Sequence, residues 1–307
     1  MIHNFLFHRV NPSRERLWDP MDVRLFDRCI RHIGNNYSIV LFEDIALTDE
    51  LFSIKHKYAT IMFDDGYKDN IQYALPILEQ HGVKASFYVV TDCINRNTPT
   101  WTYLLDYSFI NTNIKVIELD FGFLPKNLRS GKFLSSKEGL AFVYRLKPLL
   151  KTLSHDQRQV VLEKVRETFS DVELPKLMMD WNDLRSIRQS GHYIGSHTKT
   201  HAMLGSIEDT TVIKEELERS ACDINLNLGY FPISISYPVG SYNATTKLLS
   251  QECGYKIGLA VKQSPFDPMK CDLFEVPRIE LYNESWFKTR LRISNVLERF
   301  KSSIGYR

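Results

Sequence analysis

Residues 58–67 read YATIMFDDGY, a mostly apolar run that ends in two adjacent aspartates and a glycine. A continuously apolar run of this length is typical of a strand that is covered on both faces. Apolar residues at helical spacing follow between 71 and 78, with Asp69 placed to cap the helix and Gly82 to end it. The next strand pattern is KASFYVV at 84–90. These stretches predict one β-α-β unit.

The same alternation continues along the chain. Short β-rich runs lie at 37–42, 192–196, 233–237 and 256–261. Strands that alternate with helices predict a parallel α/β sheet or barrel, whose active-site residues gather at the carboxyl ends of the strands. The alternation breaks between 95 and 178, where a short strand pair and two helical stretches predict an insertion over the barrel mouth. We otherwise expect residues 1–307 to form a single domain.

Composition limits the class of protein. With 43% hydrophobic and 25% charged residues, the chain has globular proportions, and its net charge of +2 argues against a nucleic-acid partner. The five cysteines are scattered and form no CxxC pair, which favours buried thiols in a reducing compartment. Neither a charged leader with a hydrophobic run nor a transmembrane segment is visible, so we expect a cytoplasmic protein. Nothing indicates the oligomeric state.

The C-terminal segment 284–307 is rich in basic residues and has apolar residues at loose helical spacing. This pattern predicts an amphipathic basic helix that closes the barrel with its basic face in water. Peripheral contact with an anionic membrane surface is the alternative.

Two adjacent carboxylates, Asp64 and Asp65, stand where the strand at 58–63 turns into a loop before Gly66. A bend there can bring both side chains into one pocket, one to bind a cation and the other to act as a base. The alternative is a solvated Asp-Asp-Gly turn.

A second group of polar residues is GSHTKTH at 195–201, directly after a short strand. On a helical turn His197 and His201 would share a face, and two imidazoles with one carboxylate match the ligands of open catalytic zinc sites. The alternative is an accidental pair on a polar loop.

Taken together, FDDGY at 63–67 and GSHTKTH resemble the metal motifs of the polysaccharide deacetylases, carbohydrate esterase family 4. The resemblance runs from Phe5 to about Leu281, except for the insertion. It implies a distorted, incomplete (β/α) barrel with an inserted helical and β segment. It also implies a metal-dependent hydrolase that removes N-acetyl groups from an N-acetylated sugar or polysaccharide.

Carried over to this sequence, the resemblance makes Asp64 the catalytic base. Asp65, His197 and His201 become ligands of one divalent metal ion, which we expect to be Zn²⁺.

The family's third motif corresponds to residues 236–240, SYPVG. It implies that the Val239 amide donates to the developing oxyanion, and we expect Tyr237 and Pro238 to contact substrate. Ser236 stands where the family has an arginine that orients the catalytic aspartate. Arg278, in EVPRIEL, could reach the same carboxylate, although a structural role for it is equally open.

The family's usual acid is a histidine near the C-terminus, but no histidine follows His201. A branch of the family that includes the poly-N-acetylglucosamine deacetylases has this histidine near the N-terminus, and FLFHRV resembles that stretch. This nominates His8 as the general acid, with packing at a strand end as the alternative. Tyr67 and Trp101 are candidates to stack on a sugar, although both could belong to the core.

The substrate could be a polysaccharide, a surface-glycan intermediate or a small sugar conjugate. Two other functions remain open at the level of sequence. One is a cyclic imide or ureide amidohydrolase of the same fold. The other is a catalytically inactive glycan-binding protein, which the missing arginine at position 236 keeps in consideration.

Overall fold

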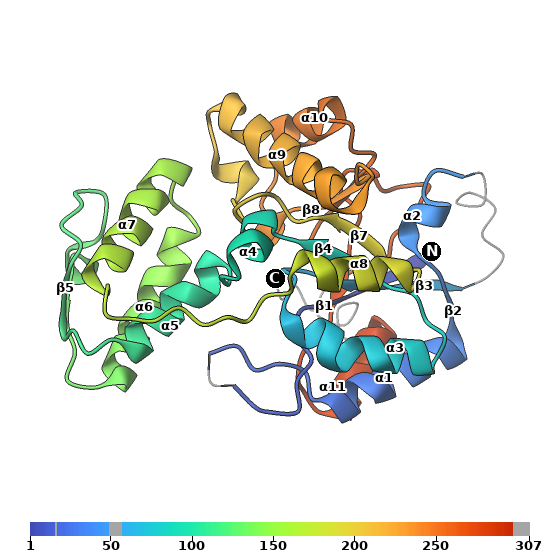
Figure 1. Ribbon diagram of the computed structural model, residues 1–307, viewed down its shortest axis with the longest axis horizontal. Coiled ribbons are helices and arrows are strands. Elements are labelled where there is room, and N and C mark those ends of the chain that lie inside the picture. The colour runs from blue at the N-terminus through green and yellow to red at the C-terminus, as the bar shows by residue number, and fades with distance from the viewer. Residues whose placement is uncertain (16, 49–56, 297–307) are drawn as a thin grey trace.

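The computed structural model describes residues 1–15, 17–48 and 57–296. The described chain has a curled parallel sheet at its centre, with strand order β10-β1-β3-β4-β7-β8-β9 and β2 paired to β3 (Figure 1). The strands are β1 Ile2–Phe7, β2 Ser38–Ile39, β3 Tyr58–Phe63, β4 Ser86–Val89, β7 Tyr193–Ser196, β8 Ser234–Ser236, β9 Ile257–Leu259 and β10 Ile279–Glu280.

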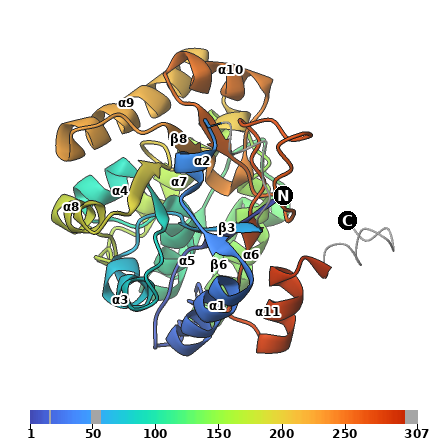
Figure 2. The ribbon, with the colours of Figure 1, turned by 90° about the vertical axis from the view of Figure 1, so that its right-hand side faces the viewer.

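Helices surround this sheet (Figure 2). Those associated with the barrel are α1 Val23–Asn36, α2 Phe42–Ile45, α3 Leu75–Gln80, α4 Thr91–Arg96, α8 Trp181–Gln189, α9 Thr210–Leu228, α10 Ala244–Glu252 and α11 Trp286–Ile293. A π-helical turn, Asn70–Ala74, precedes α3, and single 3₁₀ turns cover Leu204–Ser206 and Pro238–Gly240. The open, curled sheet with helices around it confirms the predicted incomplete (β/α) barrel.

Strand β3 is buried on both faces, as its apolar sequence predicts. Ile61 and Phe63 belong to the apolar cluster that joins the sheet to the surrounding helices, and the Phe63 ring stacks on Phe87 with centroids 4.8 Å apart. The alternate residues point the other way, and the Thr60 hydroxyl donates to Asn4 Oδ1 over 2.9 Å. This burial fixes the end of β3, from which the two aspartates emerge.

A helical layer lies beside the barrel, at the left of Figure 1. It contains α5 Trp101–Asn111, α6 Ser136–Leu150, α7 His155–Thr168, a 3₁₀ turn Lys126–Leu128 and the antiparallel pair β5 Val116–Glu118 and β6 Ser130–Lys132. The layer has its own apolar cluster, centred on residues such as Phe109, Phe142 and Leu146. The boundaries 95–178 of an insertion stay a prediction.

Helix α11 packs beside α1, where the Arg28 guanidinium lies 4.2 Å from the centre of the Trp286 ring. The part of the expected C-terminal helix at 297–307 lies outside the described residues. Of the helices in the described part of the chain, none has both the length and the apolar character that crossing a membrane requires.

Two local predictions are wrong. The strand expected at 37–42 is limited to Ser38–Ile39, because Phe42 begins a short helix that buries its apolar side chains. A short apolar run does not distinguish these two outcomes. Asp69 does not cap the following helix, because its carboxylate instead accepts a hydrogen bond of 2.8 Å from Arg9 Nε.

Candidate active site

The turn after β3 carries both aspartates into one pocket. Asp65 has φ 75° and Gly66 has φ 89°, and the Gly66 amide donates to the Asp64 carbonyl over 3.1 Å. This left-handed conformation suits glycine and is tolerated by aspartate. A Cβ on Gly66 would also lie 3.0 Å from Ile94 Cδ1, so a larger residue here would require the Ile94 side chain to shift. Asp64 and Asp65 are both buried and line the same cavity.

The two histidines reach this cavity from the loop after β7. The prediction that they share a helical turn is wrong, because residues 197–203 form no helix and His201 has φ 63°. Two contacts hold the loop in place. The buried Glu216 carboxylate of α9 accepts the amides of Lys199 and Thr200 over 3.0 and 2.9 Å, and Trp101 Nε1 donates to the His201 carbonyl over 3.2 Å.

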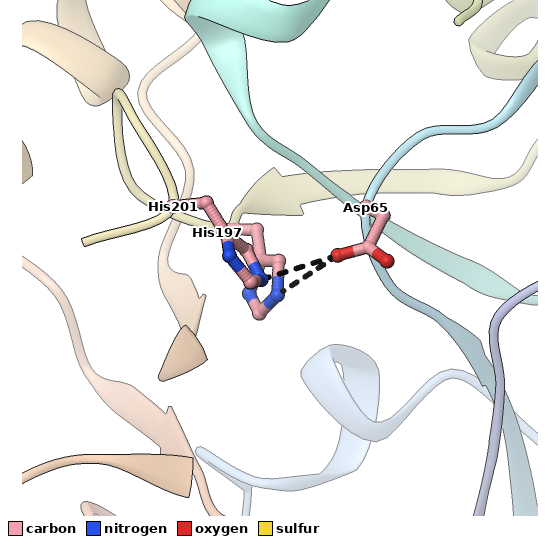
Figure 3. A group of neighbouring side chains, drawn as sticks. All are labelled: Asp65, His197 and His201. Carbon is pink, nitrogen blue, oxygen red and sulfur yellow. Dashed lines mark ion pairs between the residues drawn. The ribbon is translucent and has the colours of Figure 1, made fainter. Parts of the chain in front are cut away.

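The side chains of Asp65, His197 and His201 converge (Figure 3). Each imidazole Nε2 lies 3.4 Å from Asp65 Oδ1, and one ligand atom from each of the three residues lies within 4.8 Å of the others. His197 Nδ1 lies 2.8 Å from the Ser236 carbonyl and donates to it, so Nε2 is the ring nitrogen that faces Asp65. Two imidazole nitrogens and a carboxylate of this geometry fit a divalent ion such as zinc.

The pKa shifts of the three clustered residues are consistent with a site for a divalent ion. Burial raises the pKa of Asp65, but hydrogen bonds from His197 and His201 outweigh it and hold the pKa below its usual range. Burial lowers the pKa of His201. Burial also acts to lower the pKa of His197, but Asp64 and Asp65 outweigh it and the net pKa is raised. A bound cation would replace the proton that the raised pKa favours on His197. Its positive charge would likewise stabilise the Asp64 and Asp65 carboxylates.

Asp64 is held by Arg278, a residue of the strand-like EVPRIEL segment. The guanidinium donates to both carboxylate oxygens, over 2.8 and 2.9 Å, and Ser236 Oγ donates to Asp64 Oδ2 over 2.9 Å. Burial raises the pKa of Asp64, but the Arg278 and His197 charges outweigh it and the pKa lies below its usual value. The structure therefore brings Arg278, as the sequence allowed, to the carboxylate that the family's arginine would orient from position 236.

His8 enters the pocket from the end of β1. Its Nδ1 lies 3.4 Å from Glu280 Oε1, and the Trp18 ring lies 5.1 Å from the imidazole ring. His8, Trp18 and Glu280 all line the cavity. Sequence reasoning missed Trp18 and Glu280, because the proximity of Glu280 to His8 depends on the parallel pairing of β1 with β10.

Val239 also lines the cavity and has φ 58°, an unusual conformation for a β-branched residue. The four residues expected to contact sugar do not line it. Tyr67 and Tyr237 are fully buried in the core, and Pro238 is also buried. Trp101 is directed to the His201 carbonyl and to the helical layer instead.

The cavity has a volume of about 330 Å³, within the usual range of small-molecule sites. The helical layer completes its wall with five further polar residues that the sequence did not single out: Thr102, Tyr103, Asp106, Lys147 and Lys151. Residues of these types are common in and beside helices, so nothing in the sequence marks them as neighbours of a pocket.

The sequence model of the family described as polysaccharide deacetylase matches residues 53–258. A curated gellan lyase from Bacillus sp is 32% identical over 87 residues, which is 28% of this chain and only 4% of that protein's length.

Several solved structures share the fold. Deacetylase PplD of Streptococcus pyogenes, solved in complex with acetate, has 16% identity and a TM-score of 0.57, covering 97% of this chain and 96% of that chain. A de-N-acetylase from Aggregatibacter actinomycetemcomitans has 16% identity and a TM-score of 0.59, covering 95% and 99%. IcaB from Ammonifex degensii has 14% identity and a TM-score of 0.55, covering 95% and 96%.

Proposed function

Because the chain belongs to the polysaccharide deacetylase family, we propose that it is a metal-dependent hydrolase that removes the acetyl group from an N-acetylated sugar or glycan. One observation carries the proposal. A buried carboxylate held ionised by Arg278, Asp64, lines the same cavity as the cluster of Asp65, His197 and His201.

In this proposal Asp65, His197 and His201 hold one divalent ion, with zinc the first choice for a site of two imidazoles and a carboxylate. When bound, the ion supplies Lewis-acid polarisation of the acetyl carbonyl and makes water easier to deprotonate. The Ser236 carbonyl orients the His197 ring in advance, and the Trp101 indole holds the backbone of His201.

The remaining residues transfer protons, or stabilise and orient the groups that do so. Asp64 accepts the proton of the attacking water, and Arg278 keeps the carboxylate ionised and fixed in direction. The backbone amide of Val239 donates a hydrogen bond to the oxyanion that forms on the acetyl carbonyl. His8 donates a proton to the leaving sugar nitrogen, because an amine leaves poorly as an anion. Glu280 orients His8 through Nδ1.

The contact between Arg278 and Asp64 also bears on the inactive alternative. The hypothesis of an inactive glycan-binding protein rested on position 236, where this chain has a serine in place of the family's arginine. With a guanidinium already paired to Asp64, the sequence difference at 236 gives no reason to expect an inactive protein.

The test is acetate release by the zinc-loaded protein from N-acetylglucosamine, its oligomers and other N-acetylated sugars. We expect release by wild type, and a loss of about a thousandfold or more in Asp64→Asn, which keeps the size of the side chain but removes the base. Asp120→Asn changes an exposed aspartate in the helical layer and serves as the matched control. Equal acetate release by wild type and Asp64→Asn would contradict the proposal.

A further inference from the structure

One wall of the cavity has no role in the reaction proposed above. It is formed by Asp106 of α5, Lys147 of α6 and Lys151, which directly follows α6. A substrate whose acetamide lies near Asp65 would occupy the cavity that this wall also lines.

The charges of the cavity are almost all paired. Asp64 pairs with Arg278, Glu280 with His8, and Asp106 with Lys147. The Asp106 and Lys147 side chains are 6% and 19% exposed, so this pair belongs to the wall and does not extend into solvent. Asp65 faces the two imidazoles.

Lys151 differs from these charged residues because it belongs to no ion pair among the described residues that line the cavity. It follows the last residue of α6, where a cation also interacts favourably with the helix dipole. That interaction explains a lysine at the helix end, but it does not require the side chain to line the cavity.

Lys147 and Lys151 lie one helical turn apart and face the same cavity. The Lys151 side chain is exposed, and partial desolvation and the Lys147 charge lower its pKa, while Asp106 and Glu280 act in the opposite direction. An anion resting beside the Lys151 ammonium would give this lysine a charged partner, with the Lys147–Asp106 pair next to it in the same cavity wall.

We propose that Lys151, supported by Lys147, forms an anion-binding subsite beside the reaction centre, so that the substrate is an acidic N-acetylated sugar. The acidic group is a phosphate or a carboxylate, on the acetylated unit or on its neighbour. The reaction assigned to this substrate rests on the proposed function, whereas the binding of the acidic sugar does not.

The test separates binding from turnover. Chelator-treated, zinc-free protein is titrated calorimetrically with three sugars: N-acetylglucosamine 1-phosphate, N-acetylmuramic acid and neutral methyl N-acetylglucosaminide. Omitting zinc prevents the phosphate from binding to the metal instead. We expect at least one acidic sugar to bind about tenfold more tightly than the neutral one, as a charge-assisted contact provides. The phosphate and carboxylate arms identify which acidic group the subsite takes.

Variants identify the residue. Lys151→Met and Lys151→Glu should abolish the preference for the acidic sugar, and Lys151→Arg should retain most of it. Lys137→Met is the matched control, because Lys137 is an exposed lysine near the start of the same helix and does not line the cavity. Equal affinity for all three sugars, no binding of any, or a preference that survives Lys151→Met would overturn the inference.

Acetate release by the zinc-loaded protein is measured in parallel. Lysine-dependent binding of an acidic sugar without release would argue against the proposed function and leave the subsite standing. Equal efficiency with neutral and acidic sugars would leave the proposed function standing and overturn the subsite.

Discussion

The guanidinium of Arg278 donates two hydrogen bonds to the carboxylate of Asp64, 2.8 Å from Nη1 to Oδ1 and 2.9 Å from Nη2 to Oδ2. The two residues are 214 positions apart in the chain, and both side chains are almost inaccessible to solvent. Arg278 Nη2 also donates to Ser236 Oγ over 2.8 Å. The serine that stands where the family has an arginine therefore takes part in the same hydrogen-bond network.

Removing this guanidinium should alter the pH dependence of the reaction. Burial raises the pKa of Asp64 and Arg278 lowers it, so in Arg278→Met the pKa rises. A base must be ionised to act, and the acid limb of the kcat profile therefore moves to higher pH. The measurement is acetate release as a function of pH, and an unchanged acid limb would show that Asp64 is not the base that titrates.

The same substitution should destabilise the fold, because it leaves a buried carboxylate uncompensated. We expect a loss of about 3–5 kcal/mol in the free energy of unfolding, measured by urea denaturation at pH 7. Asp64→Asn combined with Arg278→Met should recover a large part of that loss. A double variant no more stable than Arg278→Met alone would contradict the assignment of the cost to the unpaired charge.

Trp101 should influence metal affinity although it does not line the cavity. Trp101→Phe keeps an aromatic ring and removes the indole donor to the His201 carbonyl. We expect zinc affinity to fall by up to about tenfold, measured by competition with a chelator, because the loop that carries a ligand loses a constraint. Trp181→Phe is the control, since that indole donates to Asn95 instead. An equal effect of both substitutions would remove the special role of Trp101.

His192 gives a prediction for stability in acid. Its ring is fully buried, Nδ1 accepts the Ala85 amide over 3.1 Å, and burial lowers the pKa of His192 to about 4. The unfolded chain binds a proton near the ordinary value of 6.5, so this contribution to stability is complete above pH 6.5 and is lost as pH falls through the window to about 4.

His192→Gln retains a hydrogen-bond acceptor and cannot take up that proton. Its free energy of unfolding should therefore fall less steeply than that of wild type between pH 6.5 and 4, as measured by urea denaturation at several pH values. Parallel curves for the two proteins would show that His192 is not protonated on unfolding in this range.

Much of the fold could be predicted from sequence because short apolar runs and turns set it locally. The run at 58–63 and the turn at Asp64–Gly66 needed no distant information, and both aspartates lie in the expected pocket. The strand expected at 37–42 failed because burial of Phe42 by the rest of the core decided the outcome.

The site was harder to predict where tertiary contacts bring residues together. His197 and His201 converge through a loop held by Glu216, not through helical spacing, so the predicted local reason for their proximity was wrong. Glu280 reaches His8 only through the pairing of β10 with β1, and Lys151 lines the cavity only because α6 packs beside the barrel. None of these contacts has a sequence signal of its own.

The central claim is tested most directly by measuring zinc content and acetate release on the same preparations of wild type, Asp65→Asn and Asp120→Asn. The account predicts near-stoichiometric zinc and acetate release in wild type and in Asp120→Asn, with both lost in Asp65→Asn. Wild-type protein that retains no zinc after purification with added metal, or Asp65→Asn that retains both zinc and activity, would contradict it.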